Sequence, residues 1–269
     1  MDDRGNFPDT NRLSVLLAII LLTYACLPYI NVPTNDLTIN ILGVTLNYSL
    51  NIVSLIYVIL ALLAGVGIEW LLSDHPHPQR KNTYQHFLLP VLTTWALSIP
   101  LNSIEVGLEW WVVYALGAIM LTLVFISEYI VVDFMDNRYN LASITLTAIS
   151  FALFLVIAIS IRALDLRLYL LLPAMVFPLM LICMRVLFLG LQGHKFIEWS
   201  FVISLIVGQM LIGFHYLPMR PQTFGLIIVG FAYALATLVI SIENNKRGKS
   251  IWLEPITIIM LFSGLAMVI

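Results

Sequence analysis

The chain has 269 residues, of which 61% are hydrophobic and 10% are charged. Because soluble domains carry about 25% charged residues, this composition excludes a soluble globular protein. The charged residues fall between long apolar runs, and the formal net charge of -2 provides no basic surface for nucleic acid. We therefore expect the lipid bilayer to surround most of the protein, as a multi-pass protein of the plasma (cell) membrane.

Nine apolar runs are long enough to cross the bilayer. At a rise of 1.5 Å per residue, a helix needs about 17 to 25 residues to span roughly 30 Å of hydrocarbon. The runs are continuously apolar rather than alternating, which favours helices over the strands of a barrel. They cover approximately residues 13–30, 50–72, 84–102, 109–133, 140–162, 167–190, 197–218, 222–243 and 253–269. The sequence thus predicts an all-α, polytopic transmembrane helical bundle in which residues 1–269 form a single transmembrane domain, with no soluble domain.

The positions of Lys and Arg predict the orientation of the spans. Nine of these residues fall on one side of the membrane: Arg4, Arg12, Arg80, Lys81, Arg138, Lys195, Lys246, Arg247 and Lys249. Three fall on the other side: Arg162, Arg167 and Arg220. Because cytoplasmic loops are enriched in Lys and Arg, we expect the side with nine to be cytoplasmic. This orientation places the N-terminus in the cytoplasm and the C-terminus outside.

The longest connection covers residues 31–49 and is an outer loop in this orientation. It is too short to fold as a separate domain. Residues 37–42 and 44–47 are of the type found in strands and flank Gly43, a pattern that favours a small hairpin over the outer ends of the helices. An irregular cover loop is the alternative.

Four ionisable residues inside the predicted spans share one depth: Glu69, His86, Glu128 and Arg185. The span ends and the helical rise place each of them about 4 to 8 Å below the cytoplasmic boundary. Ionisable groups in a membrane are costly and therefore indicate a functional site. If their helices are neighbours, they predict a cytoplasm-facing polar site in which Arg185 neutralises Glu128 or Glu69. His86 would be the titrating group of that site. The alternative is a structural ion pair between Glu128 and Arg185, with Glu69 reaching to the membrane surface.

A connecting loop places Asp74, His75 and His77 within four residues of one another. A proline follows each histidine, and this favours an extended backbone that separates the imidazoles. A helical zinc site would instead bring two histidines together at positions i and i+4. We expect a solvated cytoplasmic turn rather than a metal site.

Two further polar residues lie in the seventh predicted span. Gln209 falls near its middle, where interhelical hydrogen bonding is the expected role, and His215 falls near its outer end as an interfacial cap. A haem bridged by two axial histidines is disfavoured, because His86 and His215 lie near opposite faces of the membrane. We predict no metal and no cofactor.

The order of several short motifs along the chain carries a resemblance to a known family. These motifs are Gly65-Val66-Gly67-Ile68-Glu69-Trp70, Asp74-His75-Pro76, His86 with Leu88-Leu89-Pro90, Glu128-Tyr129 with Asp133, Arg167 with Leu171-Leu172-Pro173, Gly208-Gln209 with His215-Tyr216, and Phe224-Gly225 with Tyr233. The chain resembles an uncharacterised family of multi-span bacterial membrane proteins, a domain of unknown function seen in green non-sulfur-type bacteria. The resemblance implies the class of protein and no activity, cofactor or site residue.

Three functions remain open at this point. The absence of soluble domains and the glycines of the seventh and eighth spans favour a non-catalytic subunit, or an assembly or scaffold component, of a larger complex with other membrane subunits. The recurrence of Leu88-Leu89-Pro90 as Leu171-Leu172-Pro173, three spans later, is the kind of repeat found in small-solute transporters. A membrane-embedded enzyme could use the cytoplasmic-side polar residues, although the sequence contains no G-x-S-x-G, H-E-x-x-H or Cys-x-x-Cys motif.

Overall fold

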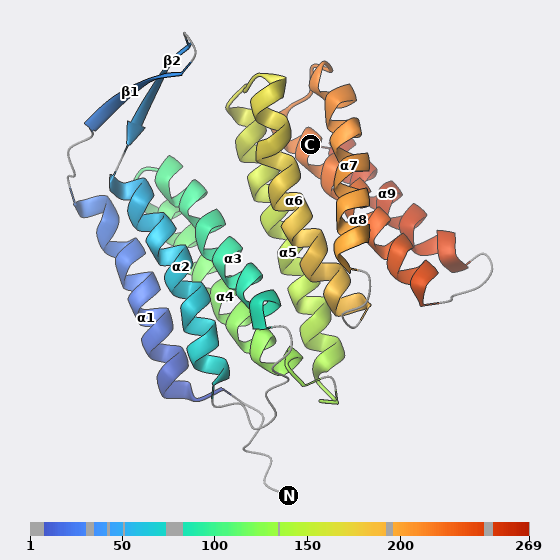
Figure 1. The fold of residues 1–269 in the computed structure, drawn as a ribbon, viewed down its shortest axis with the longest axis horizontal. Helices are drawn as coiled ribbons and strands as arrows, with labels where there is room; N and C mark the ends of the chain where they lie inside the picture. The colour runs from blue at the N-terminus through green and yellow to red at the C-terminus, as the bar shows by residue number, and fades with distance from the viewer. Residues whose placement is uncertain are drawn as a thin grey trace, which may run out of the picture. The chain divides into compact units, whose positions relative to one another are not determined.

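The nine predicted spans correspond to nine α-helices in the part of the chain that the computed structural model describes (Figure 1). The described residues are 8–30, 35–41, 44–50, 52–73, 83–133, 135–191, 196–244 and 250–268. The helices are α1 (Thr10–Cys26), α2 (Ile52–Leu72), α3 (Thr83–Ser103), α4 (Leu108–Val131), α5 (Tyr139–Ala163), α6 (Leu168–Gly190), α7 (Phe196–His215), α8 (Pro221–Glu243) and α9 (Ser250–Val268). This arrangement confirms a polytopic helical bundle, and eight of these described helices are long and apolar enough to cross a membrane.

The helices group into two compact units along the chain. Unit 1 comprises Met1–Asp136 and contains α1 to α4. Unit 2 comprises Asn137–Ile269 and contains α5 to α9. Each unit has its own set of helix contacts and is described by itself below.

Between α1 and α2, unit 1 contains a two-stranded antiparallel hairpin (Figure 1). Strand β1 (Asn35–Ile41) pairs with β2 (Val44–Leu50), so that Asn35 lies opposite Leu50 and Ile41 lies opposite Val44. The pairing satisfies the backbone of a segment that is too short to form a domain of its own. The hairpin thus occupies most of the longest connection between helices.

Helix α3 is the one described helix that falls below the hydropathy expected of a membrane span. It packs against both α2 and α4, and none of its side chains between Gln85 and Leu101 is exposed. Its polar residues therefore face protein rather than lipid. The hydroxyls of Thr93 and Thr94, for example, donate to backbone carbonyls of the preceding turn at 2.7 and 2.9 Å. Enclosure by its neighbours explains how a polar helix of spanning length is accommodated.

Aromatic residues of α4 hold unit 1 together. The buried Trp110 donates from its indole N–H to the carbonyl of Leu101 in α3 at 3.0 Å. Its ring stacks on Tyr114, whose hydroxyl donates to the carbonyl of Leu21 in α1 at 2.9 Å. Because each aromatic group buries a large apolar area and also satisfies a polar atom, this cluster links three helices.

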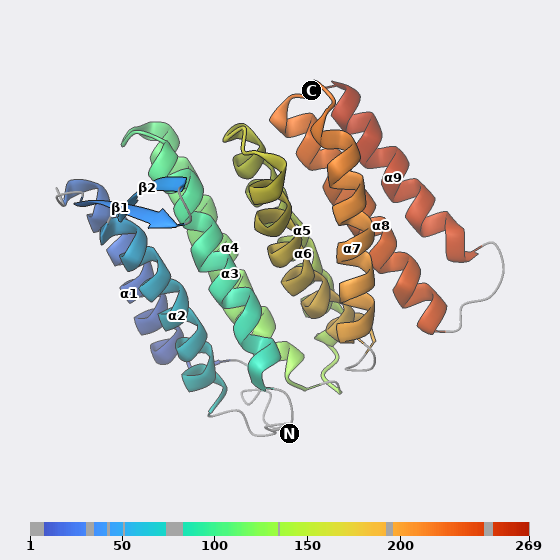
Figure 2. The same cartoon turned by 45° about the horizontal axis from the view of Figure 1, so that its top comes forward.

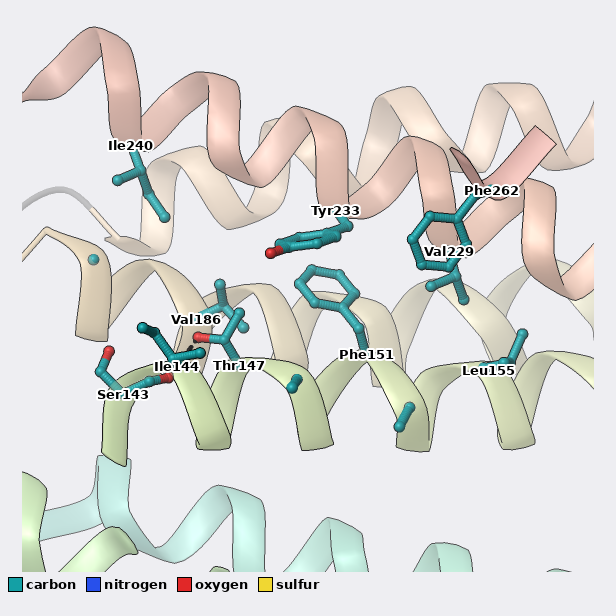
Figure 3. Close-up of a pocket in the computed structure, with 13 residues that line it drawn as sticks. Ser143, Ile144, Thr147, Phe151, Leu155, Val186, Val229, Tyr233, Ile240 and Phe262 are labelled. Atoms are coloured by element: carbon teal, nitrogen blue, oxygen red, sulfur yellow. Dashed lines mark hydrogen bonds between the residues drawn. The ribbon is translucent and has the colours of Figure 1, made fainter. Parts of the chain in front are cut away.

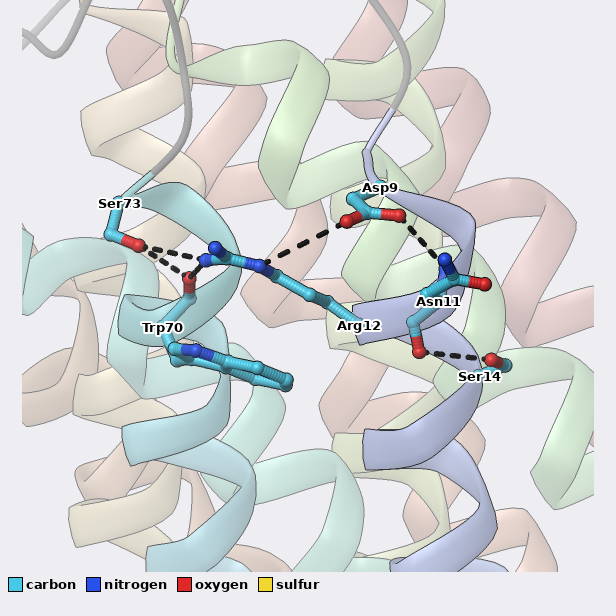
Figure 4. Close-up of polar contacts among 6 residues, drawn as sticks. All are labelled: Asp9, Asn11, Arg12, Ser14, Trp70 and Ser73. Carbon is cyan, nitrogen blue, oxygen red and sulfur yellow. Dashed lines mark hydrogen bonds and ion pairs between the residues drawn. The ribbon is translucent and has the colours of Figure 1, made fainter.

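A polar clamp joins the start of α1 to the end of α2 (Figure 4). The carboxylate of Asp9 accepts a hydrogen bond from the backbone N–H of Asn11 at 3.0 Å and caps α1. Arg12 donates to the carbonyl of Trp70 at 3.0 Å and to the hydroxyl of Ser73 at 3.1 Å. Its guanidinium also lies 5.0 Å from the centre of the Trp70 ring. A cation at this position satisfies the Trp70 carbonyl near the C-terminal end of α2 and complements the helix dipole.

In unit 2, α8 packs against α5, α7 and α9, while α6 packs against α5 and α7. Hydrogen bonds connect neighbouring helices at their ends. Tyr139 of α5 donates to the carbonyl of Leu189 in α6 at 3.1 Å, and Trp199 of α7 donates to the carboxylate of Glu243 in α8 at 2.9 Å. Helix α9 lies at the edge of the unit beside α8 (Figure 2). Most of its described side chains are exposed, which suits a helix that faces lipid tails.

Candidate functional site

The structure brings together two of the four residues predicted to form a polar site. His86 on α3 and Glu128 on α4 meet with 2.8 Å between the imidazole Nδ1 and the carboxylate Oε2. Glu128 is fully buried, and the side chain of His86 is 12% exposed. A buried carboxylate is costly unless it is paired. The His86–Glu128 pair therefore compensates an ionisable group inside the membrane and ties α3 to α4.

Glu69, the third member, does not join this pair. It lies on an exposed side of α2, beside Val66 and Trp70, which are 61% and 44% exposed. Glu69 has the same depth along its helix as His86 and Glu128, but its side chain lies on the exposed side of α2, whereas theirs are enclosed between α3 and α4. The carboxylate is thus directed toward the surroundings of unit 1, as expected for a side chain that reaches the membrane surface.

Arg185, the fourth member, belongs to unit 2. It is fully buried on α6, and its guanidinium lies 5.5 Å from the centre of the Phe188 ring. The buried position and the contact with the Phe188 ring show that packing and a cation–π interaction both hold this arginine in place. Its predicted role in neutralising Glu128 or Glu69 stays a prediction.

His215 ends α7 beside an arginine of α5. The Arg162 guanidinium lies 3.4 Å from the imidazole Nδ1 and donates to the carbonyls of His215 and Leu217, also at 3.4 Å. The same guanidinium lies 5.1 Å from the centre of the Phe224 ring of α8. This contact satisfies carbonyls at the end of α7 and holds three helix ends together.

The predicted loop residues Asp74, His75 and His77 lie outside the described residues. Among the residues that are described, no group of three or more His, Cys, Asp or Glu side chains is arranged to hold a metal ion.

Gln209 has an unusual position for an amide. It is exposed on α7, six residues before the end of the helix, which corresponds to a depth of about 9 Å. Among the described residues, none forms a hydrogen bond with its side-chain amide. One turn later Gly213 is also exposed, and a Cβ atom built there would meet nothing within 4 Å. We call this surface, which also includes the exposed Leu205 and Ile206, the α7 face.

Unit 2 contains a cavity that the sequence alone does not predict (Figure 3). It has a volume of about 460 Å³ and is lined by side chains of α5, α6, α8 and α9, among them Thr147, Val186, Tyr233 and Phe262. Ile144, which is 70% exposed, lies on its rim, so the cavity opens at the surface of α5. We call it the α5–α8 groove. Hydroxyl-bearing and small residues, such as Thr147, Ala148 and Ala152, repeat along one face of α5. This pattern indicates a cavity only once α8 is known to pack against α5.

Comparison with known proteins identifies the family. The family described as "Protein of unknown function (DUF5656)" matches residues 32–269. The chain belongs to the DUF5656 family. The match covers the hairpin and helices α2 to α9, and therefore includes the His86–Glu128 pair, the α7 face and the α5–α8 groove. No curated protein and no solved structure matches the chain. DUF5656 membership and the apolar helices together establish an integral membrane protein of an uncharacterised family.

Proposed function

We propose that this DUF5656 protein is a non-catalytic subunit, or an assembly or scaffold component, of a larger complex in the plasma membrane of a green non-sulfur-type bacterium. The observation that carries the proposal is the exposed amide of Gln209 on α7. An amide that faces hydrocarbon without a hydrogen-bond partner is costly, and a polar group on a neighbouring transmembrane helix removes that cost. Gly213, one turn away, leaves room for the backbone of such a helix to approach closely.

The predicted acid/base residues support a binding role over a catalytic one. An acid/base group must come within hydrogen-bond reach of its substrate. Glu128 is instead fully buried against His86, and Glu69 lies on an exposed side of α2. These positions are suited to holding helices together and to anchoring α2 at the membrane surface.

The orientation is part of the same proposal. Enclosure of α3 between α2 and α4 supports nine crossings, which place the two ends of the chain on opposite sides. With Arg12 and Arg138 on the side that is richer in Lys and Arg, the N-terminus lies in the cytoplasm and the C-terminus outside.

Purification from native membranes tests this function. The full chain is extracted in mild detergent, its particle mass is measured, and the co-purifying proteins are identified by mass spectrometry. We expect a membrane polypeptide in fixed stoichiometry, which Gln209→Leu loses while the chain itself still elutes as a folded particle. Gln222→Leu is the matched control, because Gln222 is exposed at the start of α8, where water can satisfy an amide. A wild-type chain that elutes alone would contradict the proposal and favour a transporter.

A further inference from the structure

We propose that the partner at the α7 face is a second copy of this chain, and that two α7 helices lie side by side in parallel with their Gln209 amides bonded to each other. The inference rests on the proposed function, because it names the partner of the surface on which that function depends. Three features of α7 support it: the spacing of its exposed residues, the chemistry of its amide and the depth of that amide in the bilayer.

The exposed residues of α7 follow the spacing of a helix pair. Val202, Leu205, Gln209 and Ile212 are all exposed, and they succeed one another at intervals of three, four and three residues. Intervals that alternate between three and four residues form the repeat by which two helices pack side by side over several turns. Helices α6 and α8 pack against α7 and leave this strip open. Val202 and Ile212 therefore extend the α7 face into a strip that a second helix can follow.

Two α7 helices have room to approach each other beside Gln209, and they meet no like charge there. A Cβ atom added at Gly213 would meet nothing within 4 Å, so another backbone can come close at this position. Residues 199–214 include no Asp, Glu, Lys or Arg. Glu198 is exposed in the first turn of α7, eleven residues before Gln209, which corresponds to about 16 Å along the helix. The strip beside Gln209 is therefore neutral in both copies.

The side-chain amide of Gln209 is complementary to itself. It carries two N–H donors and one carbonyl acceptor. Two such amides that face each other across a twofold axis exchange two N–H···O hydrogen bonds, and both are relieved of the cost of an unsatisfied polar group in hydrocarbon. The same surface then serves both copies, as in the twofold dimers that are the commonest oligomers. A single polar side chain on the strip also fixes the register of the two helices.

The bilayer brings the two amides to the same depth. Copies of one chain insert in the same direction, because the distribution of Lys and Arg sets the orientation. The twofold axis of a dimer then runs along the membrane normal, and each residue lies at the depth of its counterpart. Gln209 lies about 9 Å before the end of α7. An unrelated subunit must place a polar group at that depth independently, whereas a second copy does so by symmetry.

Mixed capture tests the identity of the partner. Two versions of the full chain with different affinity tags are expressed together, extracted in mild detergent and captured through one tag. We expect the second tag in the captured material, and Gln209→Leu in both versions should lower its amount about fivefold or more. Gln209→Asn keeps an amide at the same depth and should retain most of it. Unchanged capture of Gln209→Leu, or equal loss in the two variants, would overturn the pairing of the amides.

Disulfide formation in native membranes tests the strip itself. The exposed Cys26 is replaced by Ser, and the buried Cys183 is kept. Ile212→Cys, at a position that is 39% exposed and three residues from Gln209, should give a product of twice the chain mass on oxidation. Met260→Cys on α9, at a position that is 69% exposed, is the control and should stay at the mass of one chain. A doubled mass from Met260→Cys alone would overturn the α7 contact.

The captured material also distinguishes failure of this inference from failure of the proposed function. A different membrane polypeptide that is captured without the second tag, and that Gln209→Leu loses, would overturn the second copy and support the proposed function. Capture of neither a second copy nor another polypeptide would overturn both.

Discussion

Unit 1 buries its most costly polar groups against one another, whereas unit 2 also carries polar groups on surfaces that its own helices leave open. In unit 1, His86 and Glu128 satisfy each other at 2.8 Å and Glu128 is fully buried. In unit 2, Gln209 is exposed on α7 and the Tyr233 hydroxyl faces the α5–α8 groove. We therefore expect different roles for similar residues: the closed pair contributes to stability, and we propose that the open amide contributes to binding a partner.

The largest loss of stability is expected from His86→Ala. This change leaves the carboxylate of Glu128 buried without the imidazole, and breaking a buried pair in this way costs about 3 to 5 kcal/mol. Thermal unfolding of the purified protein in detergent measures the effect. Glu128→Gln is the comparison, because a neutral amide can keep a hydrogen bond to His86, and its loss should be smaller. Wild-type stability of His86→Ala would show that the pair does not hold α3 to α4.

A smaller loss is expected where a side chain is added between α2 and α3. A Cβ atom at Gly65 would lie 2.2 Å from the ring of Phe87, so Gly65→Leu should destabilise unit 1 by about 1 to 3 kcal/mol. Gly213→Leu is the control in unit 2, because nothing lies within 4 Å of the added atom. It should leave thermal unfolding unchanged and weaken only the association with a partner. Equal destabilisation by the two variants would contradict the difference between the closely packed surface at Gly65 and the open surface at Gly213.

The smallest of these effects is expected for the polar clamp between α1 and α2. Arg12→Ala removes two hydrogen bonds from a partly exposed guanidinium and should lower the free energy of unfolding by about 1 to 2 kcal/mol. Arg167→Ala is the matched control, because Arg167 is exposed at the start of α6 and makes no side-chain capping bond there. If both variants unfold at the wild-type temperature, the clamp contributes nothing measurable.

Several of these features could be read from the sequence, and others depend on packing. Run length predicted α3 as a span despite its polar residues, and helical rise gave His86 and Glu128 a common depth. Depth does not give the direction around a helix axis, and for this reason the sequence cannot separate the exposed Glu69 from the buried His86–Glu128 pair. The α5–α8 groove could not be predicted, because it exists only where α5 and α8, distant in sequence, lie side by side.

Site-directed photo-crosslinking on the α7 face tests the central claim most directly. A photoreactive amino acid replaces Leu205, which is 47% exposed one turn before Gln209, and native membranes are irradiated before extraction. Phe177 of α6, 64% exposed, is the control position. We predict one crosslinked membrane polypeptide of defined mass from position 205 and lipid adducts from position 177. Lipid adducts alone from position 205 would contradict a subunit bound at the α7 face.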